Sequence, residues 1–234
     1  MIAAMTLEAR IIAASLKGRK ESTVGGLTFY TGRIGHSEIV CVVSGIGKTN
    51  ASHAATALIR SYSPSWMINF GIGGAYPSSG LKTGDIAVAT GEVYADEGVL
   101  LEEGLHPLQL INIPFLKIGR RRYFNEFPLD AGLGEAVLKS VISEGRRAKA
   151  GVFTTVSACT GTKERAEDLS KRFGAICESM EGAAIAHISC RYGIPCSQIR
   201  GISNIVEDRD TSKWDIPLAS GICQRALIDF VKAL

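Results

Sequence analysis

The stretch Val43-Ser-Gly-Ile-Gly-Lys-Thr-Asn50 (VSGIGKTN) could belong to several fold classes, because it resembles two kinds of nucleotide-binding loop. A phosphate-binding P-loop needs a glycine five positions before Gly47, where this chain has Val42. A dinucleotide fingerprint needs a glycine at position 50, where this chain has Asn50. Since both patterns fail, the stretch predicts a tight turn from a strand into a helix, where small residues are common.

Short apolar runs and helical patterns alternate on both sides of this turn. The β-branched run 38–43 indicates a buried strand, and the alanine-rich segment 49–62 indicates a helix. Further strands are expected at 2–5, 27–30, 66–70, 85–90, 149–156, 175–177 and 196–203, and further helices at 7–17, 131–144, 163–173, 180–192 and 216–233. This alternation predicts one α/β domain over residues 1–234, with a central mixed, mostly parallel sheet flanked by helices.

Composition and charge exclude several classes of function. The chain has 234 residues, of which 46% are hydrophobic and 21% are charged, and a net charge of +3 that is too small to indicate a nucleic-acid partner. The densest basic run, 117–122, is expected to be a solvated loop. The six cysteines show no C-x-x-C spacing and no accompanying histidines, so we expect reduced thiols and no metal site.

The chain shows no membrane or export signal. The opening MIAAMTLEARIIAASL lacks a basic segment, and Glu8 and Arg10 interrupt its apolar run. No stretch of about 18 uncharged apolar residues occurs, so we expect a cytoplasmic protein without a membrane partner.

Two glutamates stand at the starts of predicted helices, where ligands gather near strand ends in α/β folds. Glu181 shares a predicted helix face with Ile185 and Ile188, and a carboxylate on an apolar face is costly unless it is hydrogen-bonded. Glu8 follows the first strand and lies on the side of Ile11 and Ile12. Both are candidate functional acids, and both also fit the simpler role of a first-turn acid favoured by the helix dipole.

Other polar or flexible positions lie at further strand ends. Asn204 ends the strand 196–203, and Gly71, Gly73 and Gly74 are expected to form a loop after the strand 66–70. The irregular segment 96–128 is the place where we expect a substrate-covering loop.

Five motifs together resemble the nucleoside phosphorylase/nucleosidase superfamily over nearly the whole chain. They are SGIGKTNA (44–51), NFGIGGA (69–75), GDIAVAT (84–90), ESMEGAAIAH (178–187) and IRGISN (199–204). SMEGAA is the most specific of them. The resemblance implies a nucleoside phosphorylase-like fold in which the SGIGK stretch is a turn beside the site.

Within this superfamily, three further stretches resemble the futalosine hydrolases: YADEGV (94–99), TVSACTGT (155–162) and SNIVEDRDTSKWDIPLA (203–219). That resemblance implies hydrolysis of the N-glycosidic bond of futalosine, releasing hypoxanthine, in an alternative pathway of menaquinone biosynthesis. The related methylthioadenosine/adenosylhomocysteine nucleosidases share Glu8 and the Met180-Glu181 pair, but they usually carry Asp where this chain has Asn204.

The resemblance also implies roles for the candidate residues. Glu8 would activate the attacking water as general base, Glu181 would accept hydrogen bonds from the ribose hydroxyls, and Met180 would pack against the sugar. An amide at Asn204 can donate to N7 or to O6 of hypoxanthine but cannot protonate the leaving base, so it favours a 6-oxopurine.

The remaining implied contacts concern the pocket walls and the partners. The backbone of Ile72, Gly73 and Gly74 would line the pocket, and Thr162 would contact the base. Arg209 is the candidate for the benzoate carboxylate of futalosine, with a structural salt bridge to a neighbouring aspartate as the alternative. We expect a small-molecule nucleoside substrate, no cofactor, and a homo-oligomer, a dimer or larger.

Three alternatives remain open from the sequence. A methylthioadenosine nucleosidase is disfavoured by Asn204 and by the tract that contains Arg209. A phosphate-dependent phosphorylase would need a cluster of arginines near the early loops; Arg33 and Arg60 exist, but the sequence does not place them in the site. A catalytically silent nucleoside-binding protein would not need both Glu8 and Glu181.

Overall fold

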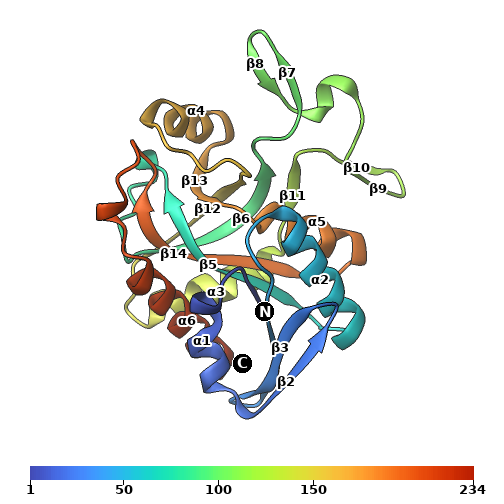
Figure 1. Ribbon diagram of the computed structural model, residues 1–234, viewed down its shortest axis with the longest axis vertical. Helices are drawn as coiled ribbons and strands as arrows, with labels where there is room; N and C mark the ends of the chain where they lie inside the picture. The colour runs from blue at the N-terminus through green and yellow to red at the C-terminus, as the bar shows by residue number, and fades with distance from the viewer.

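A computed structural model describes all residues, 1–234, and contains six α-helices and fourteen strands (Figure 1). The helices are α1 (Thr6–Ser15), α2 (Lys48–Tyr62), α3 (Ala131–Ser143), α4 (Lys163–Phe173), α5 (Gly182–Tyr192) and α6 (Ile216–Lys232). The strands are β1 (Ile2–Ala3), β2 (Lys17–Val24), β3 (Leu27–Ile34), β4 (Ser37–Val43), β5 (Met67–Ala75), β6 (Ile86–Tyr94), β7 (Val99–Leu101), β8 (Gly104–His106), β9 (Leu116–Ile118), β10 (Arg121–Tyr123), β11 (Glu126–Pro128), β12 (Ala148–Thr155), β13 (Ala175–Ser179) and β14 (Cys196–Ile205).

Ten of these strands form one mixed sheet, in the order β11-β6-β12-β13-β5-β1-β4-β3-β2. The tenth strand, β14, pairs in parallel with β5 and antiparallel with β6, so β6, β12, β13, β5 and β14 close into a ring. Parallel pairs join β4, β1 and β5 in the centre, and antiparallel pairs add the hairpin β2–β3 and the edge strand β11. The carboxyl ends of β5 and β14 thereby meet at the same edge of the ring.

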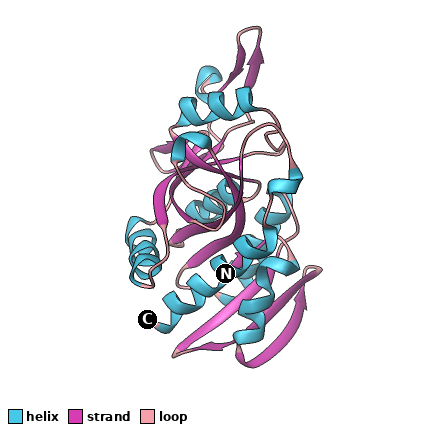
Figure 2. Cartoon of the chain, turned by 90° about the vertical axis from the view of Figure 1, so that its left-hand side faces the viewer, coloured by secondary structure: helices cyan, strands magenta, loops and turns pink.

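Helices cover the sheet from two sides, as Figures 1 and 2 show. One apolar core joins Ile12 of α1, Val137 of α3 and Leu227 of α6 to the sheet. A second core joins Leu58 of α2 and Ile185 of α5 to the other side. The expected mixed α/β sheet flanked by helices is therefore confirmed. None of the six helices is long and apolar enough to cross a membrane.

One strand was missed, and two local expectations were wrong. Strand β2 was missed because its sequence, KGRKESTV, is exposed over nearly its whole length and shows no apolar alternation. The glycines expected to form a loop at 71–74 lie inside β5. Helix α5 begins at Gly182, so Glu181 is its N-cap residue and does not lie on the helix face with Ile185 and Ile188.

The segment 96–128, where we expected a substrate-covering loop, lies away from the candidate site of this chain. It forms two small hairpins, β7–β8 and β9–β10, and then the edge strand β11. Figure 1 shows both hairpins projecting from the body of the sheet. No residue of 96–128 lines the cleft described below.

Candidate active site

A cleft of about 160 Å³ lies where the ends of β5, β13 and β14 meet the start of α1. Most of the predicted site residues line it: Glu8, Ile72, Gly73, Gly74, Met180, Glu181, Asn204 and Arg209. Two ends can be distinguished. The acid end contains Glu8, Glu181 and the neighbouring Arg200, and the amide end contains Asn204, Ser203, Thr160 and Glu178.

Glu8 is held at the acid end by three backbone N–H groups. Its Oε2 accepts hydrogen bonds from the N–H groups of Ala4 (3.1 Å) and Met5 (2.9 Å), and its Oε1 accepts one from Ile72 (2.8 Å). Met5 is the N-cap of α1, so Glu8 reaches back across the first turn as the third residue of a capping box does. The carboxylate orientation is thus fixed by the backbone of α1 and β5.

Burial raises the pKa of Glu8 above its ordinary value, because only 2% of the residue is exposed and the charged form loses hydration. Arg200 and the N–H donors of Ile72 and Met5 act in the opposite direction and favour the carboxylate. A carboxylate with a raised pKa is a stronger base than a solvated one, which is what proton abstraction from water requires.

The glycine at position 71 makes room for this acid. A Cβ built on Gly71 would lie 2.3 Å from Oε1 of Glu8 and 2.7 Å from Nη1 of Arg200. Any side chain there would displace the carboxylate. The glycines in β5 therefore permit a close approach within a strand, where the sequence had indicated a loop.

Glu181 reaches the acid end from the start of α5. Its Oε1 accepts a hydrogen bond from the N–H of Gly47 (3.0 Å), and its Oε2 lies 3.6 Å from Nη2 of Arg200. Gly47 has φ +94°, a conformation that glycine adopts without strain. The VSGIGKTN stretch is thus a strand-to-helix turn, and its backbone holds the carboxylate of Glu181 from the opposite half of the chain.

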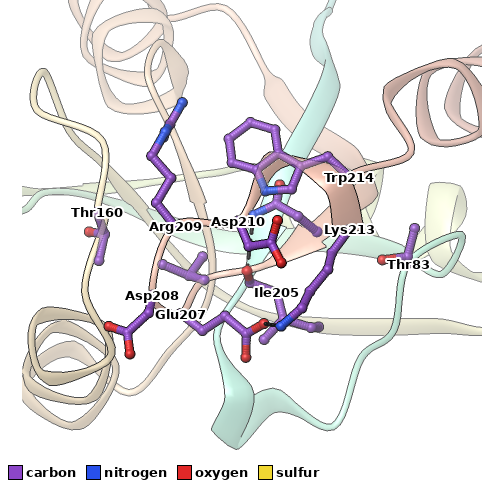
Figure 3. Close-up of a pocket in the computed structure, with 11 residues that line it drawn as sticks. Thr83, Thr160, Ile205, Glu207, Asp208, Arg209, Asp210, Lys213 and Trp214 are labelled. Atoms are coloured by element: carbon purple, nitrogen blue, oxygen red, sulfur yellow. Dashed lines mark hydrogen bonds and ion pairs between the residues drawn. The ribbon is translucent and has the colours of Figure 1, made fainter.

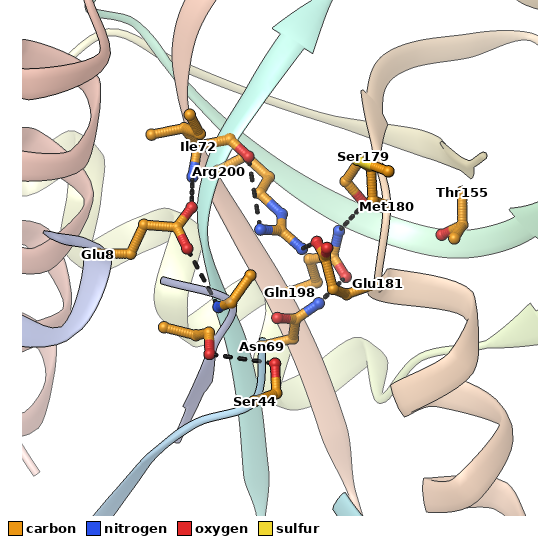
Figure 4. A network of polar contacts seen from close by, with 12 residues as sticks. Glu8, Ser44, Asn69, Ile72, Thr155, Ser179, Met180, Glu181, Gln198 and Arg200 are labelled. Atoms are coloured by element: carbon orange, nitrogen blue, oxygen red, sulfur yellow. Dashed lines mark hydrogen bonds and ion pairs between the residues drawn. The ribbon is translucent and has the colours of Figure 1, made fainter. Parts of the chain in front are cut away.

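Arg200 connects the two acids and was not selected from the sequence. It is 1% exposed, lies on β14 between Glu8 and Glu181 in the view of Figure 4, and donates from Nη1 to the carbonyl of Ile72 (3.4 Å). Its Nε and Nη2 have no hydrogen-bond partner. An arginine inside the apolar run of a predicted strand, as in IRGISN, is rare. This pattern could have identified Arg200 from the sequence.

Glu92 on β6 is a further buried acid, whose charge interacts with those of Arg200 and Glu181, and no sequence pattern had selected it. Its Oε2 accepts a hydrogen bond from Oγ1 of Thr155 (2.8 Å), and its Oε1 has no partner. Burial raises the pKa of Glu92 to about 8, against the opposing effects of the Thr155 hydrogen bond and the charge of Arg200. Glu92 is therefore expected to be neutral at neutral pH.

At the amide end, Asn204 is oriented by its neighbour. Its Oδ1 accepts a hydrogen bond from Oγ of Ser203 (2.8 Å), and its Nδ2 donates to the carbonyl of Ile205 (3.1 Å). An amide nitrogen carries two hydrogens, so one N–H of Asn204 remains for a ligand in the cleft.

Glu178 and Thr160 form the opposite wall of the amide end. Oε1 of Glu178 accepts from the N–H of Thr160 (2.9 Å), and Oε2 accepts from Oγ1 of Thr160 (2.5 Å) and the hydroxyl of Tyr76 (3.1 Å). Thr162, which we expected to contact the base, lies outside the cleft. Its Oγ1 caps α4 by accepting from the N–H of Arg165, so the loop turns away two residues after Thr160.

Arg209 and Trp214 line the cleft together with the residues of the amide end, and Figure 3 shows both side chains where they also line a neighbouring pocket. The guanidinium carbon of Arg209 lies 4.7 Å from the centre of the Trp214 ring, a cation–π contact. Arg209 makes no salt bridge with either Asp208 or Asp210, which instead accept hydrogen bonds from Lys163 and Ser212. The exposed charge of Arg209 is therefore free to meet an anionic group.

The phosphate-binding alternative finds no support at the cleft. Neither Arg33 nor Arg60 lines it, and Arg33 instead donates to the carbonyl of His36 on the surface. Met180 does line the cleft, with its Sδ 3.4 Å from Sγ of Cys159.

Comparison with known proteins identifies the family of this chain. The model of the Phosphorylase superfamily matches residues 1–234, so the chain belongs to that superfamily. It is 38% identical to the futalosine hydrolase of Thermus thermophilus over 189 residues, covering 80% of this chain and 79% of the relative. It is 31% identical to the 5'-methylthioadenosine/S-adenosylhomocysteine nucleosidase of Halalkalibacterium halodurans over 206 residues, covering 88% and 84% of the two chains.

The fold agrees with these relatives. The 5'-methylthioadenosine/S-adenosylhomocysteine nucleosidase from Neisseria meningitidis, solved with methylthio-immucillin-A, superposes with a TM-score of 0.86 at 24% identity, covering 100% of this chain and 97% of that one. The expected class, an N-glycosyl hydrolase of the nucleoside phosphorylase/nucleosidase superfamily, is confirmed, since the curated relatives named here are a futalosine hydrolase and a nucleosidase.

Proposed function

We propose that this nucleosidase hydrolyses the N-glycosidic bond of futalosine and releases hypoxanthine, as a step of menaquinone biosynthesis in the cytoplasm. The observation that carries the proposal is Asn204, an amide whose oxygen is held by Ser203 and whose nitrogen keeps one N–H for the cleft. That donor suits N7 or O6 of a 6-oxopurine. The similarity to the Thermus thermophilus futalosine hydrolase supports the same substrate.

The acid end supplies the means to attack the sugar. Cleavage builds positive charge on the ribose, and Glu8, with its raised pKa, takes a proton from the attacking water as that charge develops. Glu181 accepts hydrogen bonds from the ribose hydroxyls, and Met180 packs against the ring. Arg200 compensates the charge of both acids, so that two carboxylates can stay buried in one cleft.

The amide end stabilises the departing base. Negative charge collects on the purine as the bond breaks, and the N–H of Asn204 meets it without transferring a proton. The cleft is also lined by the backbone of Ile72, Gly73 and Gly74. Arg209 binds the benzoate carboxylate of futalosine at the outer side of the cleft, where its charge is not paired with an aspartate.

A release assay on three substrates tests the function. The purified protein is incubated with futalosine, inosine and methylthioadenosine, with and without phosphate, and the products are separated. Hypoxanthine from futalosine, together with a free ribosyl product, supports the proposal. Ribose 1-phosphate products would indicate a phosphorylase, and no release from any substrate would indicate a binding protein.

The second candidate is a methylthioadenosine/adenosylhomocysteine nucleosidase. It is favoured by the relatives of that name, which include proteins 31% and 30% identical to this chain. Adenine release from methylthioadenosine that is faster than hypoxanthine release from futalosine would select this candidate.

We also propose a homo-oligomer, a dimer or larger. Six large apolar side chains of the segment 96–128 are more than 40% exposed: Leu100, Leu101, Leu110, Ile111, Ile113 and Ile118. Exposed apolar groups of this size on one segment are typical of a protein interface. Light scattering after size-exclusion chromatography would give the mass, and a monomer of 24.9 kDa would contradict the proposal.

A further inference from the structure

We propose that Glu178 is a specificity residue for the base and accepts a hydrogen bond from the N1–H of a 6-oxopurine, while Asn204 donates to its O6 or N7. The inference rests on the proposed function for the bond that is cleaved and for the role of Asn204. It adds a second contact to the base and the reason why adenine would be rejected.

The sheet places Glu178 and Asn204 on either side of one glycine. Gly74 of β5 pairs with Glu178 of β13 on one side and with Asn204 of β14 on the other. Two strand spacings separate their backbones by about 10 Å. A Cβ on Gly74 would lie 2.6 Å from Cγ2 of Val206 and 3.4 Å from Nδ2 of Asn204, so glycine leaves room beside the Asn204 amide. All three residues line the cleft, and this gap suits a flat ring held at both edges.

The Glu178 carboxylate has acceptor capacity left. Its Oε2 receives two hydrogen bonds, from Thr160 and Tyr76, whereas its Oε1 receives only the one from the N–H of Thr160. Each carboxylate oxygen can accept two, so one position on Oε1 is open. No lysine or arginine forms a salt bridge with Glu178, although it is only 8% exposed. A donor from the ligand would complete its hydrogen bonding.

The chemistry of the two purines differs at this position. A 6-oxopurine carries a hydrogen on N1, and a charged acceptor binds such a donor about twice as strongly as a neutral one. Adenine has a lone pair on N1, which would face the carboxylate oxygen without a proton between them. A site built around a ligand N–H rejects the analogue that lacks it, because a buried polar group is then left unpaired.

A purely structural role for Glu178 makes a different prediction. If the carboxylate only anchored the loop that carries Thr160, its loss would affect all nucleosides equally. The ratio of activities on two bases therefore separates the roles, because the ratio does not respond to a general loosening of the loop.

The test compares kcat/KM for futalosine with that for its 6-amino analogue, which differs only in the base. In Glu178→Gln, an amide oxygen can still accept from the N–H of Thr160 but is a weaker acceptor for N1–H. We expect kcat/KM for futalosine to fall about tenfold and that for the 6-amino analogue to stay constant or rise. Glu135→Gln on α3 is the matched control, since it makes the same exchange at an exposed carboxylate that pairs with Lys139 and does not line the cleft, and the ratio should not change.

A second measurement uses the unmodified protein and so does not depend on the folding of a variant. Futalosine methylated at N1 cannot donate there, and we expect its kcat/KM to be at least about tenfold below that of futalosine. Equal turnover of the two, or an unchanged ratio in Glu178→Gln, would overturn the inference. If the role of Glu178 is overturned but the wild-type protein still prefers futalosine, the proposed function stands. A wild-type preference for the 6-amino analogue would overturn both the role of Glu178 and the proposed function.

Discussion

The two acids of the acid end accept hydrogen bonds only from backbone N–H groups, whereas hydroxyl groups supply three of the five hydrogen bonds of Asn204 and Glu178 at the amide end. Glu8 and Glu181 accept from the N–H groups of Ala4, Met5, Ile72 and Gly47, which the sheet and two helix starts fix in place. Asn204 and Glu178 are oriented by the hydroxyls of Ser203, Thr160 and Tyr76. We infer that the acid end serves the attack on the ribose, whichever base the nucleoside carries. The amide end sets the preference for the base, and a few substitutions there can change that preference.

The largest expected effect comes from Glu8→Gln. The variant keeps acceptors for the backbone N–H groups but cannot take a proton, so kcat should fall about 10³-fold on every substrate. In the wild type, activity should fall as the pH drops through the raised pKa of Glu8, and this limb should be absent from the variant. The measurement is a pH profile of kcat/KM, and wild-type turnover in the variant would refute the role of general base.

Glu92 should make the stability of the fold depend on pH. Its pKa is raised from 4.5 to about 8 in the folded protein, so unfolding releases a proton between these values. The contribution of Glu92 to stability is therefore fully present below about pH 4.5 and is lost as the pH rises through 8, by on the order of 5 kcal/mol. Urea unfolding at several pH values measures this slope. Glu92→Gln should flatten it, and parallel slopes for both proteins would contradict the buried neutral acid.

Asn204→Asp sharpens the comparison because it changes only the amide end. A protonated Asp can donate to N7 and accept from the 6-amino group of adenine, whereas an ionised one repels O6. The ratio of kcat/KM for futalosine to that for its 6-amino analogue should fall about 30-fold. Equal losses on both substrates would mean that Asn204 does not read the base.

Arg209→Met should have the smallest effect, since this cation is exposed. We expect KM for futalosine to rise about fivefold and KM for inosine, which has no benzoate, to stay unchanged. Lys213→Met is the matched control, because Lys213 is a nearby cation already paired with Glu207 at 2.9 Å. A similar rise with Lys213→Met would point to the general charge of this rim and against a specific contact.

Much of the fold and part of the site could be predicted from the sequence. Alternating apolar runs located the strands and helices of the core, and the SMEGAA motif located Met180 and Glu181. Strand β2 could not be found because an exposed edge strand needs no apolar pattern. The glycines of β5 were wrongly predicted to form a loop. Gly71 is needed because Glu8 packs against it, and these two residues are 63 positions apart in the sequence.

The site residues that were missed depend on tertiary contacts. Arg200 and Glu92 become functional candidates only when the ring of strands brings them under Glu8 and Glu181. Thr160 was missed in favour of Thr162 because a loop can turn within two residues, and only the hydrogen bonds to Glu178 show which threonine faces the cleft.

The preference of the wild-type protein between futalosine and its 6-amino analogue tests the central claim most directly, since the two substrates share the ribose and the benzoate. The arrangement of Glu8, Glu181 and Asn204 predicts that kcat/KM for futalosine is at least about 100-fold higher. Equal values, or faster cleavage of the 6-amino compound, would contradict an amide end built for a 6-oxopurine.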